Sequence, residues 1–476
     1  MTVTAKELVA KFAEAVAVGD AAVFVGAGTS IEAGLPSWDA LIGDARVAAD
    51  VPDSLKDAPL AAEYIANVDG ESALHAAIRR KIDVDARPTA VHQLLARLPI
   101  RDYWTTNYDL LVEQSLEEQH VKYQEVVGEK DYAHGAAAGT ALKRVTKMHG
   151  SLTTGNHGRR NWAEPPVITR SDFERYEERH PITWTRLRAS WLTNSFLFLG
   201  LSFDDPNLNL LLKLSRSLPS QIDAPPHYVV FAEKSDPVDK RLQELRVADL
   251  ESSGVRVHMM NSHGDLEKVL NQLEVRCRPA RLFISGSFDV DGTDEADKFS
   301  HTVAQSIGAT LAAMPADVRP VIASFGGPAG LAVSRQFREA LSPSEYRPEL
   351  VHLYYRKAET ADESIPIEHR VGMAIFTEKT LAEMRNVVFS QVRAMVVING
   401  SARTADEAVA AQGHGVVVIP VGATGGAAKT IWDSMKPNEI GLDTPEEIVW
   451  WDQLNSDSAT LAAHAAGMLI KRLMFE

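Results

Sequence analysis

AAVFVGAGTSIEAGLPSWD, residues 21–39, joins an apolar run to a glycine turn. The run 23–25 predicts a buried strand, and Gly26 and Gly28 predict a tight turn directly after it. Glycine at such a turn lets a diphosphate approach the main chain, and a helix beginning there would present free N–H groups to a phosphate. A plain turn between a strand and a helix is the simpler alternative, so the interpretation depends on the rest of the chain.

Three later apolar segments also run into polar or glycine residues. They are IRDYWTTNYD (100–109) with Asn107 and Asp109, VTKMHGS (145–151) with His149, and SFLFLGLS (195–202) with Gly200. Because the carboxyl ends of parallel strands share one edge of an open α/β sheet, we expect these residues beside the first glycine turn. A histidine at this edge is suited to general-base work because its ordinary pKa is near neutral. The alternatives are that Asn107 and Asp109 only cap the next helix and that His149 is structural.

The chain is long enough for two domains. Its 476 residues exceed one ordinary core, and strands alternate with helical stretches until the pattern restarts at RLFISGSFD, 281–289. We predict two α/β domains, residues 1–278 and 279–476, each a doubly wound Rossmann-like fold with a mostly parallel sheet. Apolar residues at helical spacing predict a first helix near the N-terminus and a small helical lobe over 40–98 in the first domain.

The second domain has three glycine-containing strand ends of its own. They are Gly286-Ser287, Gly326-Gly327 and Asn399-Gly400. Each can end a strand and open a helix, so together they could line a pocket for phosphate and ribose groups. Arg385 and Arg403 could pair with phosphate, and Glu407 could accept hydrogen bonds from ribose hydroxyls. The alternative is that Arg385 is a surface charge and Glu407 only begins a helix.

Composition limits the classes of function. The net charge of -15 argues against general nucleic-acid binding, which needs excess Lys and Arg. The single cysteine, Cys277, excludes an internal disulfide and a multi-cysteine zinc site, and we expect no bound metal. No apolar run approaches the ~20 residues that cross a bilayer. We therefore expect no membrane association and a location in the reducing cytoplasm.

The ordered motifs of the first domain resemble those of the sirtuin family over roughly residues 15–275. These motifs are GAGTS (26–30), GLPSW (34–38), TTNYD (105–109), HG (149–150) and GLS (200–202). The resemblance implies NAD+ as the ligand, with Asn107, Asp109 and His149 around the nicotinamide ribose and His149 as the base. The residues that it assigns to the rest of the NAD+ site are Gly26, Ala27, Gly28, Ser30, Gly200 and Ser202.

Departures from the sirtuin pattern bear on the expected reaction. Protein-deacylating sirtuins carry a four-cysteine zinc module, which a chain with one cysteine cannot build. The usual Asp-Phe-Arg after the second motif is replaced by 37–39, SWD, and the usual Gln before Asn107 is Thr106. We therefore expect hydrolysis of NAD+ to nicotinamide and ADP-ribose. NAD-dependent deacylation, ADP-ribosyl transfer and non-catalytic sensing of NAD or ADP-ribose remain the alternatives.

The second domain resembles the SLOG-type nucleotide-binding family through Gly286, the GGPAG run at 326–330 and a degenerate glycine-Thr-x-x-Glu motif over 400–407. A sirtuin-like domain followed by a SLOG-like domain resembles the NAD-consuming effectors of the Thoeris anti-phage system. This order implies a cyclic ADP-ribose-type signal, a TIR-domain protein that makes it, and a homo-oligomer, for which a tetramer is one candidate. The residues predicted to bind the signal are Gly286, Ser287, Gly326, Gly327, Arg385, Gly400, Arg403 and Glu407.

Overall fold

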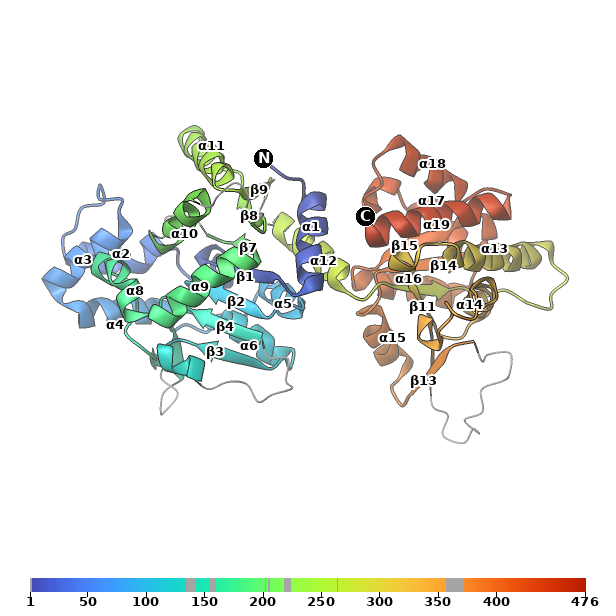
Figure 1. Ribbon diagram of the computed structural model, residues 1–476, viewed down its shortest axis with the longest axis horizontal. Coiled ribbons are helices and arrows are strands. Elements are labelled where there is room, and N and C mark those ends of the chain that lie inside the picture. Colours follow the sequence, from blue (N-terminus) through green and yellow to red (C-terminus); the bar gives the residue numbers. More distant parts are fainter. Residues whose placement is uncertain are drawn as a thin grey trace. The chain divides into compact units, whose positions relative to one another are not determined.

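The computed structural model describes residues 2–133, 143–154, 160–201, 203, 206–217, 224–262, 264–356 and 371–476. The chain divides into two compact units, Met1–Cys277 and Arg278–Glu476. Each unit has its own parallel sheet with helices on both faces (Figure 1), so the predicted α/β class is confirmed.

The first unit is built on a seven-stranded sheet in the order β3-β4-β2-β1-β7-β8-β9. Its strands are β1 (Ala21–Val25), β2 (Asp102–Thr105), β3 (Tyr123–Val126), β4 (Lys143–Lys147), β7 (Ser195–Leu199), β8 (His227–Ala232) and β9 (Val255–Met260). All neighbouring strands in it run parallel. Every residue of β1 is buried, and the strand order reverses between its neighbours β2 and β7. In open α/β sheets this reversal marks the usual place for a ligand.

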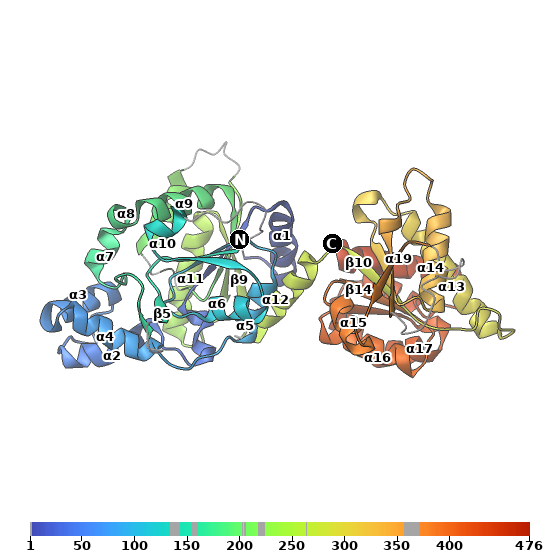
Figure 2. The same ribbon diagram turned by 90° about the horizontal axis from the view of Figure 1, so that it is seen from below.

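Helices cover both faces of this sheet (Figures 1 and 2). One face packs against α1 (Ala5–Val18), α5 (Ala90–Arg97), α6 (Leu111–Glu118) and α12 (Gly264–Cys277). The other face packs against α7 (Arg170–Glu174), α8 (Tyr176–Arg179), α9 (Pro181–Thr193), α10 (Pro206–Ser217) and α11 (Pro237–Ser252). The predicted first helix is α1, which buries Leu8, Phe12 and Val16 at helical spacing.

A helical lobe is present but is shorter than predicted. It consists of α2 (Trp38–Ala48), α3 (Ala58–Asp69) and α4 (Glu71–Ile82), which share one core cluster with Tyr108, Leu152 and Ile168. Although the prediction placed α5 in this lobe, its buried residues join the core on the sheet beside α1 and α12. An unpredicted antiparallel hairpin, β5 (Leu152–Thr154) and β6 (Arg160–Trp162), packs against the lobe through Trp162.

The second unit has a six-stranded parallel sheet in the order β13-β12-β11-β10-β14-β15. Its strands are β10 (Arg281–Ser285), β11 (Val321–Ser324), β12 (Val351–Arg356), β13 (Met373–Thr377), β14 (Ala394–Ile398) and β15 (Val417–Val421). One face packs against α13 (Glu295–Ala312), α14 (Pro328–Ala340), α18 (Pro445–Gln453) and α19 (Ala459–Phe475). The other packs against α15 (Leu381–Phe389), α16 (Ala402–Gly413) and α17 (Gly426–Ser434). Within the described ranges, no helix has the length and apolar character needed to cross a membrane.

Candidate active site

Four neighbouring strands, in the order β4-β2-β1-β7, end beside the residues selected from the sequence. The register pairs Val25, the last residue of β1, with Thr105 of β2 and Leu199 of β7, and pairs Thr105 with Lys147 of β4. The glycine turn, the Asn107–Asp109 turn, His149 and Gly200 follow directly along the chain. These residues therefore share one edge of the sheet, at the reversal of strand order.

The glycine turn packs against the end of β7 through backbone contacts. The amide of Gly26 donates to the carbonyl of Leu199 at 2.8 Å, and the amide of Gly28 donates to the carbonyl of Gly200 at 2.9 Å. A Cβ on Gly28 would lie 2.8 Å from the Gly200 Cα. Gly200 has a φ of +67°, and a Cβ on it would lie 2.6 Å from the Thr29 nitrogen. The two loops can meet at this distance only because glycine stands on both sides.

The helix predicted directly after this turn is absent. Two short 3-10 helices, Ala27–Thr29 and Ile31–Ala33, follow β1, and α2 begins only at Trp38. A continuous helix is interrupted because Gly34 takes a left-handed φ of +86° and the next turn contains Pro36, which lacks an N–H group.

The backbone amides of the glycine turn differ in whether they can donate a hydrogen bond to a diphosphate. Those of Gly26 and Gly28 are already used against β7, whereas Ala27 is exposed and its amide has no acceptor in the described part of the chain. A diphosphate here could accept a hydrogen bond from Ala27, while the glycines would allow its close approach. Ser202, the last residue of the predicted NAD+ set, lies outside the described residues.

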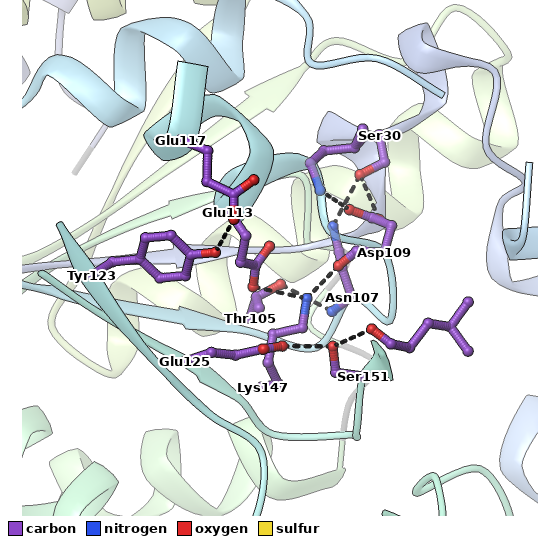
Figure 3. A network of polar contacts seen from close by, with 12 residues as sticks. Ser30, Thr105, Asn107, Asp109, Glu113, Glu117, Tyr123, Glu125, Lys147 and Ser151 are labelled. Atoms are coloured by element: carbon purple, nitrogen blue, oxygen red, sulfur yellow. Dashed lines mark hydrogen bonds and ion pairs between the residues drawn. The ribbon is translucent and has the colours of Figure 1, made fainter. Parts of the chain in front are cut away.

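Ser30 connects the glycine turn to the turn after β2. Its Oγ donates to Oδ2 of Asp109 at 2.9 Å and accepts from Nδ2 of Asn107 at 3.1 Å (Figure 3). Asn107 is 7% exposed, and its Oδ1 is buried with no hydrogen-bond partner among the described residues. A buried acceptor left unsatisfied costs about 1–3 kcal/mol, so this oxygen is a suitable acceptor for a hydroxyl or water brought by a ligand.

Asp109 also has a role in the backbone. Its Oδ1 accepts from the amide of Leu111 at 3.1 Å, in the first turn of α6. The capping alternative is therefore confirmed for this oxygen, while Oδ2 faces Ser30. The carboxylate holds the turn in place from two sides.

His149 lies against aromatic rings. It is 3% exposed, its ring centroid is 5.1 Å from that of Phe173 in an edge-to-face arrangement, and it is 6.5 Å from that of Tyr108. Tyr108 stands between Asn107 and Asp109 in the chain, and its hydroxyl donates to the carbonyl of Val167 at 2.7 Å. These contacts fix the imidazole next to the second turn. They suit both a base and a structural histidine, so the role of His149 stays a prediction.

Two charged residues next to the carboxyl edge of the first sheet were not predicted from the sequence. Lys147 ends β4, and Glu113 lies in the first turn of α6; their side chains are 1% and 4% exposed. The available signals were a lysine between Thr146 and Met148 at the strand end, and a glutamate directly after Leu111 and Val112 in the helix that follows TTNYD.

The glycines of the second unit end three neighbouring strands, β11, β10 and β14. Gly286 has a φ of +144°, and a Cβ on it would lie 1.9 Å from the carbonyl oxygen of Ile398. The amide of Gly400 donates to the carbonyl of Ser287 at 3.1 Å. The third pair, Gly326-Gly327, leads directly into α14, with Gly327 as its N-cap. The predicted strand-end residues therefore lie at one edge of the second sheet.

The charged residues predicted for the signal site form one cluster around Glu407. Oε1 of Glu407 is 3.1 Å from a terminal nitrogen of Arg385 and 3.4 Å from Nε of Arg403, while Oε2 accepts from the Ser285 hydroxyl at 2.7 Å. Glu407 is 6% exposed and lies inside α16, so it does not merely begin a helix. Arg385 has a side chain only 16% exposed, so it is not a surface charge.

Two family models match the chain. The SIR2-like domain model matches residues 101–257, and the model of the Sir2- and TIR-associating SLOG family matches residues 265–461. The chain combines a SIR2-like domain with a SLOG-type domain. The SIR2-like match includes Asn107, Asp109, His149 and Gly200, whereas the glycine turn lies before its start.

Several relatives resemble the chain over most of its length. A protein from Cytobacillus dafuensis named NAD(+) hydrolase ThsA is 29% identical over 90% of this chain and 88% of its own, and a ThsA from Bacillus cereus (strain MSX-D12) is 26% identical over 89% and 88%. A ThsA from Enterococcus faecium is 30% identical over 59% and 61%. Among solved structures, a Sir2 homolog–NAD complex aligns with 57% of this chain and 94% of its own at 14% identity and a TM-score of 0.35, too distant to inform the site.

The predicted NAD+ residues that the structure describes lie at the carboxyl edge of the first sheet. Among the residues that the structure describes, no group of three or more His, Cys, Asp and Glu side chains could hold a metal ion.

Proposed function

We propose that the SIR2-like domain hydrolyses NAD+ at the bond between nicotinamide and ribose, giving nicotinamide and ADP-ribose. The buried Oδ1 of Asn107 carries the proposal, because this acceptor lies between the glycine turn and the end of β2 and has no partner among the described residues. The names of the ThsA relatives support the same reaction.

Cleavage of the bond between nicotinamide and ribose needs a correctly oriented ribose and a group that accepts the proton of the attacking water. As the glycosidic bond breaks, positive charge develops on the ribose; water then bonds to the anomeric carbon and releases a proton. Asn107 would hold a ribose hydroxyl or the attacking water, and His149 would accept the proton directly or through a ribose hydroxyl. Asp109 would orient its neighbours through Ser30.

Replacement of the two central residues tests this assignment. We expect Asn107→Ala and His149→Ala each to lower nicotinamide release by about 100-fold or more, since both remove a group used in the transition state. His258→Ala, on β9, is the matched control and should retain wild-type activity. Undiminished release by a folded His149→Ala or Asn107→Ala protein would refute the corresponding role.

We further propose that the SLOG-type domain binds a cyclic ADP-ribose-type signal that activates hydrolysis and so depletes NAD+ during anti-phage defence in the cytoplasm. The match of residues 265–461 to the Sir2- and TIR-associating SLOG family supports a TIR-domain protein as the source of the signal. Arg385, Arg403 and Glu407 would exchange contacts with one another for contacts with the phosphates and ribose of the signal. Assembly into a homo-oligomer, with a tetramer as one candidate, would accompany activation.

Product analysis separates this function from the alternatives. A deacylase would form acyl-ADP-ribose, a transferase would form modified protein, and a sensor would retain NAD+ without releasing nicotinamide. Hydrolysis alone yields nicotinamide and free ADP-ribose in equal amounts.

A further inference from the structure

A buried ion pair lies next to the proposed active site. Nζ of Lys147 is 3.2 Å from Oε1 of Glu113, and both side chains are almost fully buried. The same ammonium donates a hydrogen bond to the backbone carbonyl of Asp109 (Figure 3). The ammonium at the end of β4 therefore contacts helix α6 and the turn between Asn107 and that helix.

The pair is not explained by stability alone. Removing two charges from water costs several kcal/mol per ion, and a buried pair of this kind often contributes no more than a well-packed apolar pair. The contact of Lys147 with Glu113 has ion-pair distance without hydrogen-bond geometry. The directed hydrogen bond of Lys147 goes to Asp109 instead.

The position of the pair links the two halves of the proposed site. Lys147 stands two residues before His149, and Glu113 stands four residues after Asp109. From Asp109 the contacts continue through Ser30 to Asn107. Displacing the ammonium would thus release the Asn107–Asp109 turn from the strand that carries His149.

A second contact fixes the other side of the same strand end. The hydroxyl of Ser151, two residues after His149, donates to Oε1 of Glu125 on β3 at 2.8 Å (Figure 3). The backbone around His149 is therefore held both before and after the histidine, and the link to the Asn107 turn is made by Lys147.

We propose that Lys147 and Glu113 are positioning residues for the cleavage of NAD+: Lys147, neutralised by Glu113, fixes the Asn107–Asp109 turn relative to His149. This inference rests on the proposed hydrolase function. Neither residue touches the reacting atoms; they act through Asp109 and through the strand end.

The charges around Glu113 make its ion pair with Lys147 sensitive to pH. Burial raises the pKa of Glu113 to about 7, against the lowering effect of Lys147 on β4, while Glu125 on β3 and Asp109 in the turn raise it further. As the pH falls through this value, Glu113 gains a proton and the ammonium loses its counter-charge. Activity should therefore decline on the acid side in a way that depends on Glu113.

The test uses the full chain and the double variant Glu113→Gln/Lys147→Met, which leaves no buried charge unpaired. Nicotinamide release is measured with and without cyclic ADP-ribose. We expect kcat to fall about 10- to 100-fold, as displacement of a site by about 1 Å would cause, with KM changed by less than about threefold. The matched control is Asp102→Asn/Arg144→Met, an ion pair at 3.1 Å that joins β2 to β4, the strand of Lys147, and it should retain wild-type kcat.

A pH profile separates positioning from a general loss of structure. Glu113→Gln should be slower than wild type near pH 8 and approach the wild-type rate near pH 6, where Glu113 of the wild type is itself protonated. The positioning role alone would be overturned if the ratio of the Glu113→Gln rate to the wild-type rate were the same at both pH values. A folded double variant with kcat within about twofold of wild type would overturn it as well. A wild-type chain that never releases nicotinamide would overturn the hydrolase function and this inference together.

Discussion

At the scale of single residues, the glycine turn makes a sharp prediction. Gly28→Ala should lower the free energy of unfolding by about 1–3 kcal/mol and weaken NAD+ binding, because the new Cβ would lie 2.8 Å from the Gly200 Cα, where backbone must move. Gly43→Ala is the control: this glycine lies inside α2 with nothing within 4 Å of a Cβ, so the change should be neutral or stabilising by up to about 1 kcal/mol. Thermal unfolding and NAD+ titration of both variants test the difference.

Single residues at strand ends could be predicted, whereas their partners could not. Asn107, His149 and Gly200 were found because glycine, histidine and amide residues after apolar runs form a local pattern. The contacts of Ser30 with Asp109 and of Lys147 with Glu113 join residues far apart in sequence, and no local pattern encodes them. For the same reason the cluster around Glu407 could not be predicted. Its members were predicted as ligand-binding groups but not as partners of one another.

At the scale of elements, α18 and α19 are joined through one carboxylate. Glu447 forms a capping box with Thr444 and an ion pair with Arg472 of α19. Burial would raise the pKa of Glu447, but hydrogen bonds from the amides of Thr444 and Asp443 and from Arg472 together lower it to about 2. The stabilisation is therefore complete above the ordinary glutamate pKa and is lost as the pH falls through about 2.

The corresponding experiment is thermal unfolding of Glu447→Gln at neutral and strongly acid pH. At neutral pH the variant should lose about 3 kcal/mol in free energy of unfolding, because Arg472, whose side chain is only 14% exposed, is left without its partner. Near pH 2 the difference from wild type should shrink. Glu446→Gln, in the same helical turn but exposed, is the control and should behave as wild type at both pH values. A deficit independent of pH would contradict the assignment.

Strands with nearly continuous apolar runs were predicted, whereas the edge strands β3 and β13 were not. The central strands β1, β7, β10 and β14 carry nearly continuous apolar runs because both faces are covered. In the edge strand β3 only Val126 is buried, and β13 buries no residue fully, so neither gives a clear pattern. The delayed start of α2 followed from the geometry of Gly34, which composition alone does not fix.

At the scale of the whole molecule, the two units predict regulated hydrolysis. Arg385→Ala and Glu407→Ala should each abolish the dependence of nicotinamide release on cyclic ADP-ribose, because each removes a charge from the cluster proposed to bind it. Lys471→Ala, which removes an exposed ion pair on α19, should leave that dependence unchanged. Normal dependence in a folded Arg385→Ala protein would show that the signal binds elsewhere.

We propose that the chain hydrolyses NAD+ under control of a nucleotide signal. The most direct measurement is incubation of the full wild-type chain with NAD+, with and without cyclic ADP-ribose, followed by mass-spectrometric analysis of all products. We predict nicotinamide and ADP-ribose in equal amounts, formed faster when the signal is present. Acyl-ADP-ribose, ADP-ribosylated protein, or NAD+ that stays intact under both conditions would contradict it.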